Sequence, residues 1–240
     1  IGAKNEYIRQ TEDINYQSLS FNERLYSLLE SQDIYLSNQK INMLRKLSKI
    51  RDKQASIANI DYLPKRKINK QLIIELASMN FIKSYQNVIV SGCTVSGKTY
   101  CIQALGNRAI ENGYKTYYIR VPTLLEEIKI ARATGTYINI LKKYQRFQLL
   151  ILDDFGISQM SSDDAINLLE ILEDRVQISS TIIASQLPVS SWYEYLNNNT
   201  VADAILDRLV HSSHRLELQG GSMRRIKSTI KKFDEEIDEI

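Results

Sequence analysis

The sequence predicts an α/β fold, in which a parallel sheet flanked by helices follows a small all-helical N-terminal domain. From residue 87 onward, apolar stretches of strand length alternate with helical patterns, and this alternation is typical of a doubly wound parallel sheet. A glycine-containing loop at residues 92–99 separates the first strand from the first helix of this series. A strand that ends in two carboxylates follows at residues 148–154.

The N-terminal region, residues 18–58, has the periodicity of helices. Ser20, with Glu23 three residues later, forms the pattern of a capping box, so a helix is expected to begin there. Leu25, Leu28 and Leu29 form an i, i+3, i+4 stripe that we interpret as packing surface. A second, basic helix is expected to follow in the same region.

The borders of the α/β part are set by changes in composition. Pro64, which stands among basic residues, marks a boundary, and a short helix is expected at residues 72–77. The last seven residues carry five acids and no base. The expected parts are a helical N-terminal domain, an α/β domain and a charged C-terminal tail, at residues 1–58, 59–225 and 226–240.

The α/β part is expected to alternate regularly. Its expected strands are residues 87–91, 114–121, 148–152 and 180–185. Its expected helices are residues 98–112, 123–134, 137–144, 161–176 and 200–210. Gly113 and Gly135 are stop signals for the first two of these helices. Thr123, with Glu126 three residues later, is expected to cap the second.

The loop at residues 92–99, G-C-T-V-S-G-K-T, matches the phosphate-binding pattern G-x-x-x-x-G-K-[ST]. A helix N-terminus attracts anions, because its N–H groups are unpaired and the helix dipole favours negative charge. Lys98 is expected to contact the β- and γ-phosphates of ATP, and the Thr99 hydroxyl to bind Mg²⁺. A chance match in an ordinary loop is the alternative, which the strand–loop–helix context disfavours. The other expected ATP contacts are Gly92, Cys93, Thr94, Val95, Ser96, Gly97 and Tyr100.

Asp153 and Asp154 end the apolar run that begins at residue 148. Ligands of open α/β sheets bind at the carboxyl ends of the strands, so both carboxylates are expected to face the phosphate loop. Asp153 is expected to hold Mg²⁺ through water, and Asp154 to orient or deprotonate the attacking water. The alternative is a solvated strand end followed by a turn at Phe155 and Gly156.

Composition excludes several other classes of protein. Cys93 and Cys101 belong to no spaced set with histidines, so neither a zinc site nor a disulfide framework is expected. No apolar run approaches membrane-spanning length and no signal peptide is visible, so we expect a cytoplasmic protein without a membrane partner. The segment from Lys40 to Lys70 contains ten basic residues and two acidic ones. This block suggests a polyanionic partner, and a solvated linker face is the alternative.

Five segments together resemble the IstB family of AAA+ ATPases, and the resemblance spans about residues 19–224. They are the phosphate loop, the strand with its two carboxylates, A-S-Q-L-P-V at 184–189, A-D-A-I-L-D-R-L-V-H at 202–211 and G-S-M-R at 221–224. Members of this family are helpers of the transposase in bacterial insertion sequences and are related to the DnaC helicase loaders. The resemblance implies an AAA+ P-loop ATPase core that uses ATP and Mg²⁺.

The resemblance also implies partners. They are duplex DNA, which the ATP-bound protein would bind and bend, the transposase of the same element, which it would recruit or stimulate, and further copies of the chain in a homo-oligomer with ATP sites at subunit interfaces. A helicase loader, whose N-terminal domain would grip a replicative helicase, is the alternative. A nucleotide-dependent binding module without turnover is a third possibility.

Three further residues acquire roles from the resemblance. Arg208 occupies the position of the family's arginine finger, which reaches the γ-phosphate of a neighbouring subunit; a surface ion pair with an aspartate of the same helix is the alternative. Gln186 ends a core strand, where a polar sensor of the γ-phosphate belongs. Arg224 is expected to be a second phosphate sensor, with Arg225 as an equal alternative.

Two residues depart from the usual AAA+ pattern. Val95 stands where most phosphate loops of this class have an internal glycine, and Asp154 stands where most have glutamate. The shorter side chain of aspartate holds its carboxylate further from the substrate. Hydrolysis is therefore expected to be slow, or to need DNA or a partner.

A basic set on the helix pair 123–144 is expected to contact DNA phosphates. Lys129 and Arg132 are three residues apart and project from one helix face, and Lys142 and Lys143 follow on the second helix. This pair lies between the second and third core strands, where initiator-type AAA+ proteins carry an inserted DNA-facing helix. A solvated helix with pairs such as Glu126–Lys129 is the alternative.

Overall fold

The computed structural model describes residues 1–62, 67–94 and 96–219. Its strands are β1 (Asn87–Gly92), β2 (Thr116–Arg120), β3 (Leu149–Phe155), β4 (Ser180–Ser185) and β5 (Ser213–Leu218). Its α-helices are α1 (Gly2–Glu12), α2 (Phe21–Leu47), α3 (Lys70–Ala77), α4 (Asn80–Lys83), α5 (Lys98–Glu111), α6 (Val121–Ala133), α7 (Tyr137–Gln145), α8 (Ser162–Glu173), α9 (Trp192–Leu196) and α10 (Asn199–Val210). Short 3₁₀ helices are η1 (Ile14–Ser18), η2 (Ile57–Asn59) and η4 (Val189–Ser191).

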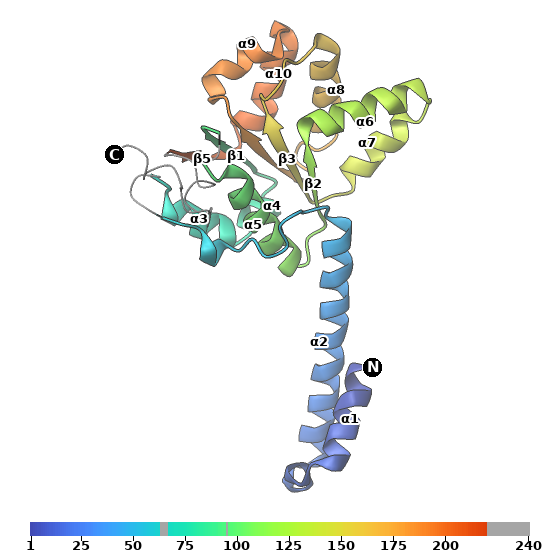
Figure 1. The fold of residues 1–240 in the computed structure, drawn as a ribbon. Coiled ribbons are helices and arrows are strands. Elements are labelled where there is room, and N and C mark those ends of the chain that lie inside the picture. Colours follow the sequence, from blue (N-terminus) through green and yellow to red (C-terminus); the bar gives the residue numbers. More distant parts are fainter. Residues whose placement is uncertain (63–66, 95, 220–240) are drawn as a thin grey trace, which may run out of the picture.

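The five described strands form one parallel sheet in the order β2-β3-β4-β1-β5 (Figure 1). This confirms the predicted parallel α/β core. The edge strand β5 was not predicted, because its sequence is short and half polar; only Leu216 and Leu218 of its residues are buried. β5 pairs with β1 and so completes the sheet beside the strand that leads into the phosphate loop.

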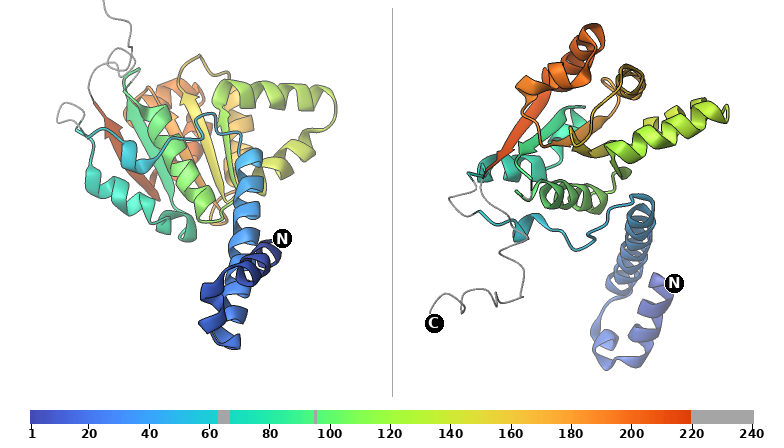
Figure 2. Two further views of the ribbon diagram at one scale, coloured as in Figure 1. Left: turned by 60° about the horizontal axis from the view of Figure 1, so that its bottom comes forward. Right: turned by 45° about the horizontal axis from the view of Figure 1, so that its top comes forward.

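Helices cover both faces of the sheet, because strand side chains alternate between two apolar clusters. Ile89 of β1 belongs to the cluster formed with α6, α7, α8, α9 and α10. Val88 and Val90 belong to the cluster formed with α3, α4, α5 and the last turn of α2. Two further views show the helices on either side of the sheet (Figure 2).

The N-terminal region consists of α1 and a single long α2 that projects from the α/β core (Figure 1). The expected capping box of Ser20 and Glu23 is present, but the expected division into two helices is wrong. No glycine or proline interrupts residues 21–47, so one helix continues throughout. Leu44 lies in the core cluster of the α/β part, and a domain border near residue 58 stays a prediction.

Of the stripe expected to be packing surface, Leu25 and Leu29 are exposed in the protomer, and Leu28 is half-buried. α1 packs instead against the face of α2 that carries serines. The Ser27 hydroxyl donates to Glu6 at 2.7 Å, and a Cβ at Gly2 would lie 2.3 Å from the carbonyl oxygen of Ser31. Small residues let the two helices approach closely at this face.

The start of α6 differs from the prediction. Thr123 does not cap it; the helix begins at Val121, directly after β2, with Arg120 at the N-cap and no side-chain cap bond. Pro122 stands in the first turn, where the N–H group that proline lacks would have no partner within the helix. Among the described residues, no helix is both long and apolar enough to cross a membrane.

Arg175 joins two backbone segments in the core through three carbonyl oxygens. Its guanidinium is buried and donates to the carbonyl oxygens of Tyr144 (2.7 Å), Phe147 (2.9 Å) and Ser180 (2.7 Å). Burial lowers the pKa of Arg175 to about 9. The side chain thereby fixes the amino ends of β3 and β4. Asp153, Asp154 and Gln186 follow at the carboxyl ends of these two strands.

Candidate nucleotide site

The phosphate loop requires glycine at both of its pattern positions. Gly92 has φ +152°, and a Cβ there would lie 2.2 Å from the carbonyl oxygen of Leu218 in β5. Gly97 has φ +93° and is the N-cap of α5. This is the left-handed region, which glycine adopts without steric cost. Val95 lies outside the described residues.

Lys98 lies in the first turn of α5 and folds back over the loop. Its ammonium donates to the carbonyl oxygens of Gly92 (2.6 Å) and Cys93 (2.7 Å), and the residue is 8% exposed. Burial lowers the pKa of Lys98, and the negative charges of Asp153 and Asp154 act in the opposite direction. A buried cation therefore lies at the loop, near the two carboxylates.

The two carboxylates stand at a β-bulge. Asp153 and Asp154 of β3 lie between two regular pairs, Leu152 with Ile183 and Phe155 with Ser185. Asp154 therefore takes the left-handed conformation, with φ +60°, which costs a non-glycine residue about 1 kcal/mol or more. A bulge re-aims the side chains beside it, so the two neighbouring aspartates face different partners.

The Asp153 carboxylate accepts hydrogen bonds from two donors. It is 2% exposed and accepts from the Tyr118 hydroxyl (Oδ2, 2.7 Å) and from the Asp154 N–H (Oδ1, 2.8 Å). Burial raises the pKa of Tyr118, which keeps the hydroxyl a donor. The Asp153 carboxylate is thus fixed in orientation before any ligand binds.

Asp154 forms an ion pair with Arg120, the last residue of β2. This hydrogen bond raises the pKa of Arg120. The sequence did not indicate Arg120 or Tyr118, because their contacts depend on the register that places Arg120 beside Asp153. Sequence order alone does not show that β2 and β3 are neighbours.

The remaining expected ligands gather at the same end of the sheet. Thr94 donates to the side-chain oxygen of Gln186 at 2.8 Å, so the end of β4 touches the phosphate loop. Tyr100 bonds through its hydroxyl to the backbone of Ser56 (3.3 Å) and ties the segment after α2 to α5. Thr99 is exposed at the start of α5. Arg224 and its alternative Arg225 lie outside the described residues.

The site has donors that suit Mg²⁺, a hard cation that is usually bound through one or two carboxylates together with substrate phosphates. Asp153 supplies a fixed carboxylate and Thr99 a hydroxyl. In residues 1–62, 67–94 and 96–219, no three His, Cys, Asp or Glu side chains gather as a metal-binding group. Asp153 and Thr99 fit a metal that is held jointly with a nucleotide.

Arg208 lies at the opposite end of β1 from the phosphate loop. The side chain of Asn87, the first residue of β1, donates to the Arg208 carbonyl oxygen at 3.0 Å. The five residue steps from Asn87 to Gly92 span roughly 17 Å of strand. Arg208 also pairs with Glu173 of α8 at 3.0 Å, whereas Asp207 of its own helix is 3.9 Å away.

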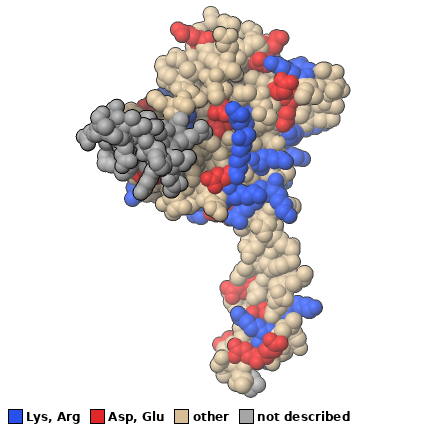
Figure 3. Space-filling view, in the orientation of Figure 1, with Lys and Arg blue, Asp and Glu red and all other residues tan. Residues whose placement is uncertain are grey.

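The cations on α6 and α7 pair with acidic residues of the same protein. Lys129 pairs with Asp164 of α8 at 3.2 Å, and no ion pair joins it to Glu126 among the described residues. The other pairs are Arg132 with Glu170 (3.4 Å) and Lys143 with Glu127 (2.7 Å). Within the described part of the chain, exposed Lys142 forms no ion pair. Figure 3 shows a second group of basic side chains where α2 joins the core.

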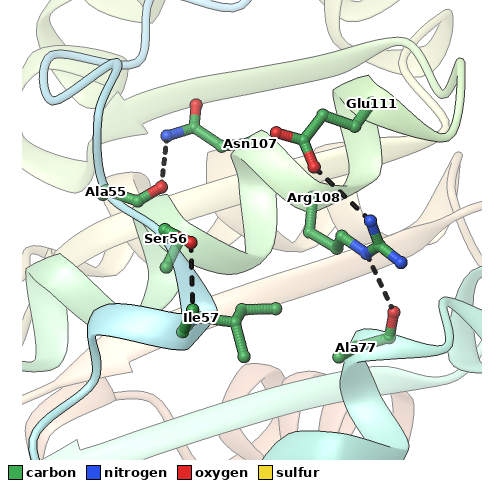
Figure 4. Close-up of a pocket in the computed structure, with 9 residues that line it drawn as sticks. Ala55, Ser56, Ile57, Ala77, Asn107, Arg108 and Glu111 are labelled. Atoms are coloured by element: carbon green, nitrogen blue, oxygen red, sulfur yellow. Dashed lines mark hydrogen bonds and ion pairs between the residues drawn. The ribbon is translucent and has the colours of Figure 1, made fainter.

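A cavity of about 370 Å³ lies along α5, between Ala104 and Glu111 (Figure 4). It is separate from the phosphate loop, which lies at the other end of this helix. Asn107 on its wall donates to the carbonyl oxygen of Ala55 at 2.8 Å, and Arg108 lies 3.5 Å from Glu111. These polar groups are paired with other groups of the same chain, and the cavity is not part of the nucleotide site.

Solved structures with this fold include nucleotide-binding proteins. The protein superposes on the crystal structure of DnaI with a TM-score of 0.61 and 21% identity, covering 70% of this chain and 92% of that one. For AMPPCP-bound DnaA from Aquifex aeolicus the values are 0.60 and 18%, covering 72% of this chain and about half (52%) of that one. At these identities the likeness shows a shared fold.

Sequence comparison is more specific. A putative insertion sequence ATP-binding protein (y4pL) of Sinorhizobium fredii is 39% identical over 209 residues, covering 87% of this chain and 85% of that protein. The putative ATP-binding protein of insertion sequence IS1162 from Pseudomonas fluorescens is 36% identical over 174 residues, covering 72% and 75%. The model of the family described as IstB-like ATP binding protein matches residues 1–231. The chain therefore belongs to the IstB-like ATP-binding family and is an ATPase with an AAA+ P-loop core.

Proposed function

We propose that this ATPase is the DNA-binding helper of a bacterial insertion sequence. In this proposal it binds ATP and Mg²⁺, oligomerises on duplex target DNA, bends that DNA, and recruits or stimulates the transposase of the same element. The two relatives from Sinorhizobium fredii and Pseudomonas fluorescens are described as insertion sequence ATP-binding proteins, which favours this function over helicase loading. Because both ATP and chromosomal DNA are available in the bacterial cytoplasm, we place the activity there.

The position of Arg208 is the observation that carries the oligomeric part of the proposal. The residue lies at the amino end of β1, and the phosphate loop follows the carboxyl end. The intervening length, roughly 17 Å, exceeds the reach of an arginine side chain. As an arginine finger, Arg208 would therefore act on the ATP of a neighbouring subunit, and the complete site would belong to two chains.

Within one site, the contacts support the following roles. Lys98 would exchange its two loop carbonyls for phosphate oxygens, and Thr99 and Asp153 would hold Mg²⁺. Bound Mg²⁺ would neutralise phosphate charge. Asp154 orients the attacking water, but Arg120 engages it in the free protomer. Asp154 must be released from this ion pair before it can act on water. Hydrolysis is therefore expected to be slow without DNA or a partner.

For DNA, we propose phosphate contacts by Lys129, Arg132, Lys142 and Lys143 of the α6–α7 pair. Three of these cations already pair with acidic residues, so DNA phosphates must compete with these ion pairs. Arg132 and Glu170 are both exposed, and a surface pair of this kind is weak, about 0–1 kcal/mol, so a polyanion can displace it. The pairs of Lys129 and Lys143 are partly buried, and DNA must displace stronger interactions there. Contacts of this kind fix position without reading sequence.

Electron microscopy of the protein with duplex DNA tests the proposal. With ATP, ordered oligomers on bent DNA are expected, and with ADP or with the Lys98→Ala variant they should be absent. Transposase from the same element should be retained only by the ATP-bound complex. Assembly on a replicative helicase in place of duplex DNA would contradict the proposal.

Mixing two inactive variants tests the shared site. Arg208→Ala should bind ATP but hydrolyse it poorly, and Asp154→Asn should do the same. Together they should recover part of the activity, because mixed oligomers contain some interfaces with an intact Asp154 and an intact Arg208. No recovery, with subunit exchange demonstrated, would place Arg208 outside the neighbouring site.

A further inference from the structure

We propose that Glu173 restrains Arg208 in the free protomer, so that assembly must transfer the arginine from this carboxylate to the phosphates of a neighbouring subunit. The inference rests on the proposed role of Arg208 as an arginine finger. It adds a positioning residue on α8 that sets how readily the finger becomes available.

The guanidinium of Arg208 makes three hydrogen bonds within its own chain. Nη2 donates to Glu173 Oε1 at 3.0 Å, and Nε pairs with Oε2 of the same carboxylate. Nη1 donates to the carbonyl oxygen of Ala204 at 3.0 Å. Two parallel bonds between a guanidinium edge and a carboxylate form the most directional ion-pair geometry that proteins use. The finger is thus held by one specific acid.

No other described acid competes for this position. Asp207 reaches only 3.9 Å from Nη1 and also pairs with His211. Arg208 lowers the pKa of Glu173, mainly through their hydrogen bond, so the carboxylate is charged at neutral pH. The pair therefore exists under the conditions in which ATP would be hydrolysed.

The ion pair is not needed to hold the two helices together. α8 and α10 pack through buried residues that include Leu168, Ile205 and Leu209. Glu173 is 54% exposed and Arg208 27% exposed, and exposed pairs contribute little to folding. Arg208 also borders a cavity of about 470 Å³ at the amino ends of β1 and β4, so the side chain can move without disturbing the core.

These observations predict a competition. The phosphates of a neighbouring subunit must bind Arg208 more strongly than Glu173 does. The Glu173 carboxylate therefore raises the protein concentration that is needed to form shared sites. Glu173→Gln keeps the shape of the side chain and removes its charge. We expect the concentration for half-maximal ATPase activity to fall about two- to fivefold, the range that corresponds to an exposed ion pair.

The test uses two chains, each unable to hydrolyse ATP alone. The donor chain carries Asp154→Asn and keeps Arg208, and the acceptor chain carries Arg208→Ala and keeps Asp154. Activity in the mixture then comes from interfaces where the donor supplies the finger. Glu173→Gln is placed in the donor or in the acceptor, and activity is measured against total protein at a fixed ratio.

Placement in the donor should lower the half-maximal concentration two- to fivefold, and placement in the acceptor should have no effect. Glu173→Asp in the donor should restore part of the restraint. Glu194→Gln in the donor is the control for loss of an exposed charge, because Glu194 forms no ion pair within the described residues, and it should have no effect.

Two results would overturn the inference while leaving the shared site intact. One is that the mixture recovers activity, but Glu173→Gln has the same effect in the donor as in the acceptor, or no effect in either. The other is lower activity with the substitution in the donor, which would mean that Glu173 orients the finger productively. If the unsubstituted mixture recovers nothing although labelled subunits exchange, the trans role of Arg208 fails, and the inference fails with it.

Discussion

Replacement of Lys98 by alanine should abolish most ATP binding and leave the fold intact. The ammonium already bonds two oxygens, those of Gly92 and Cys93, so it can reach two acceptors at once. Hydrogen bonds to charged groups contribute about 1.5–3 kcal/mol each. Part of this gain is offset because the loop carbonyls lose their partner, so a net loss of about 2–4 kcal/mol is expected. That loss corresponds to roughly 30- to 700-fold weaker binding.

The effect of Lys98→Ala on folding should be small. The variant removes two bonds to carbonyl oxygens of a loop whose Cys93 and Thr94 are exposed, so water can replace the ammonium. The free energy of unfolding should change by about 1 kcal/mol or less.

Titration with a fluorescent ATP analogue, together with circular dichroism and urea unfolding, measures both quantities. Lys83→Ala, which removes an exposed lysine from α4, is the matched control and should bind ATP normally. A folded Lys98→Ala variant with near-normal affinity would refute the assignment of the phosphate loop.

Four other variants probe the carboxylates, the core and the DNA surface. Asp153→Ala should lose Mg²⁺-dependent ATP binding, whereas Asp154→Asn should keep ATP bound and stop hydrolysis; equal loss of affinity in both would contradict their separate roles. Arg175→Leu should lower the free energy of unfolding by about 3 kcal/mol or more, because buried carbonyl oxygens left without donors cost about 1–3 kcal/mol each; a urea midpoint unchanged from wild type would show that the buried guanidinium is dispensable. Joint replacement of Lys129 and Arg132 by alanine should reduce the salt dependence of DNA binding by roughly 0.9 in slope per lost phosphate contact per subunit, and an unchanged slope would remove both from the interface.

The alternation of strands and helices was sufficient to predict the parallel core, because strands covered on both faces have continuous apolar sequences. The run at residues 149–152 is such a strand. The phosphate loop was predictable for a different reason. Its glycines meet a backbone requirement, since Gly92 and Gly97 both have positive φ, and such requirements leave a sequence pattern.

Contacts between distant segments left no comparable pattern. The bonds of Tyr118 to Asp153 and of Arg120 to Asp154 depend on strand order and on a bulge. The pairing of Arg208 with Glu173 depends on the packing of two helices far apart in sequence. The first helix was missed because its contact with α2 uses small and polar residues, such as Gly2, in place of an apolar stripe.

Fluorescence anisotropy of labelled duplex DNA tests the central claim most directly. Binding is measured with ATP, with ADP and without nucleotide, for the wild-type protein and for Lys98→Ala. ATP-dependent assembly predicts tight binding only for the wild type with ATP, and weak binding in every other case. Equal affinity for DNA with and without ATP, or full binding by Lys98→Ala, would contradict the claim that ATP at the phosphate loop controls this protein's hold on DNA.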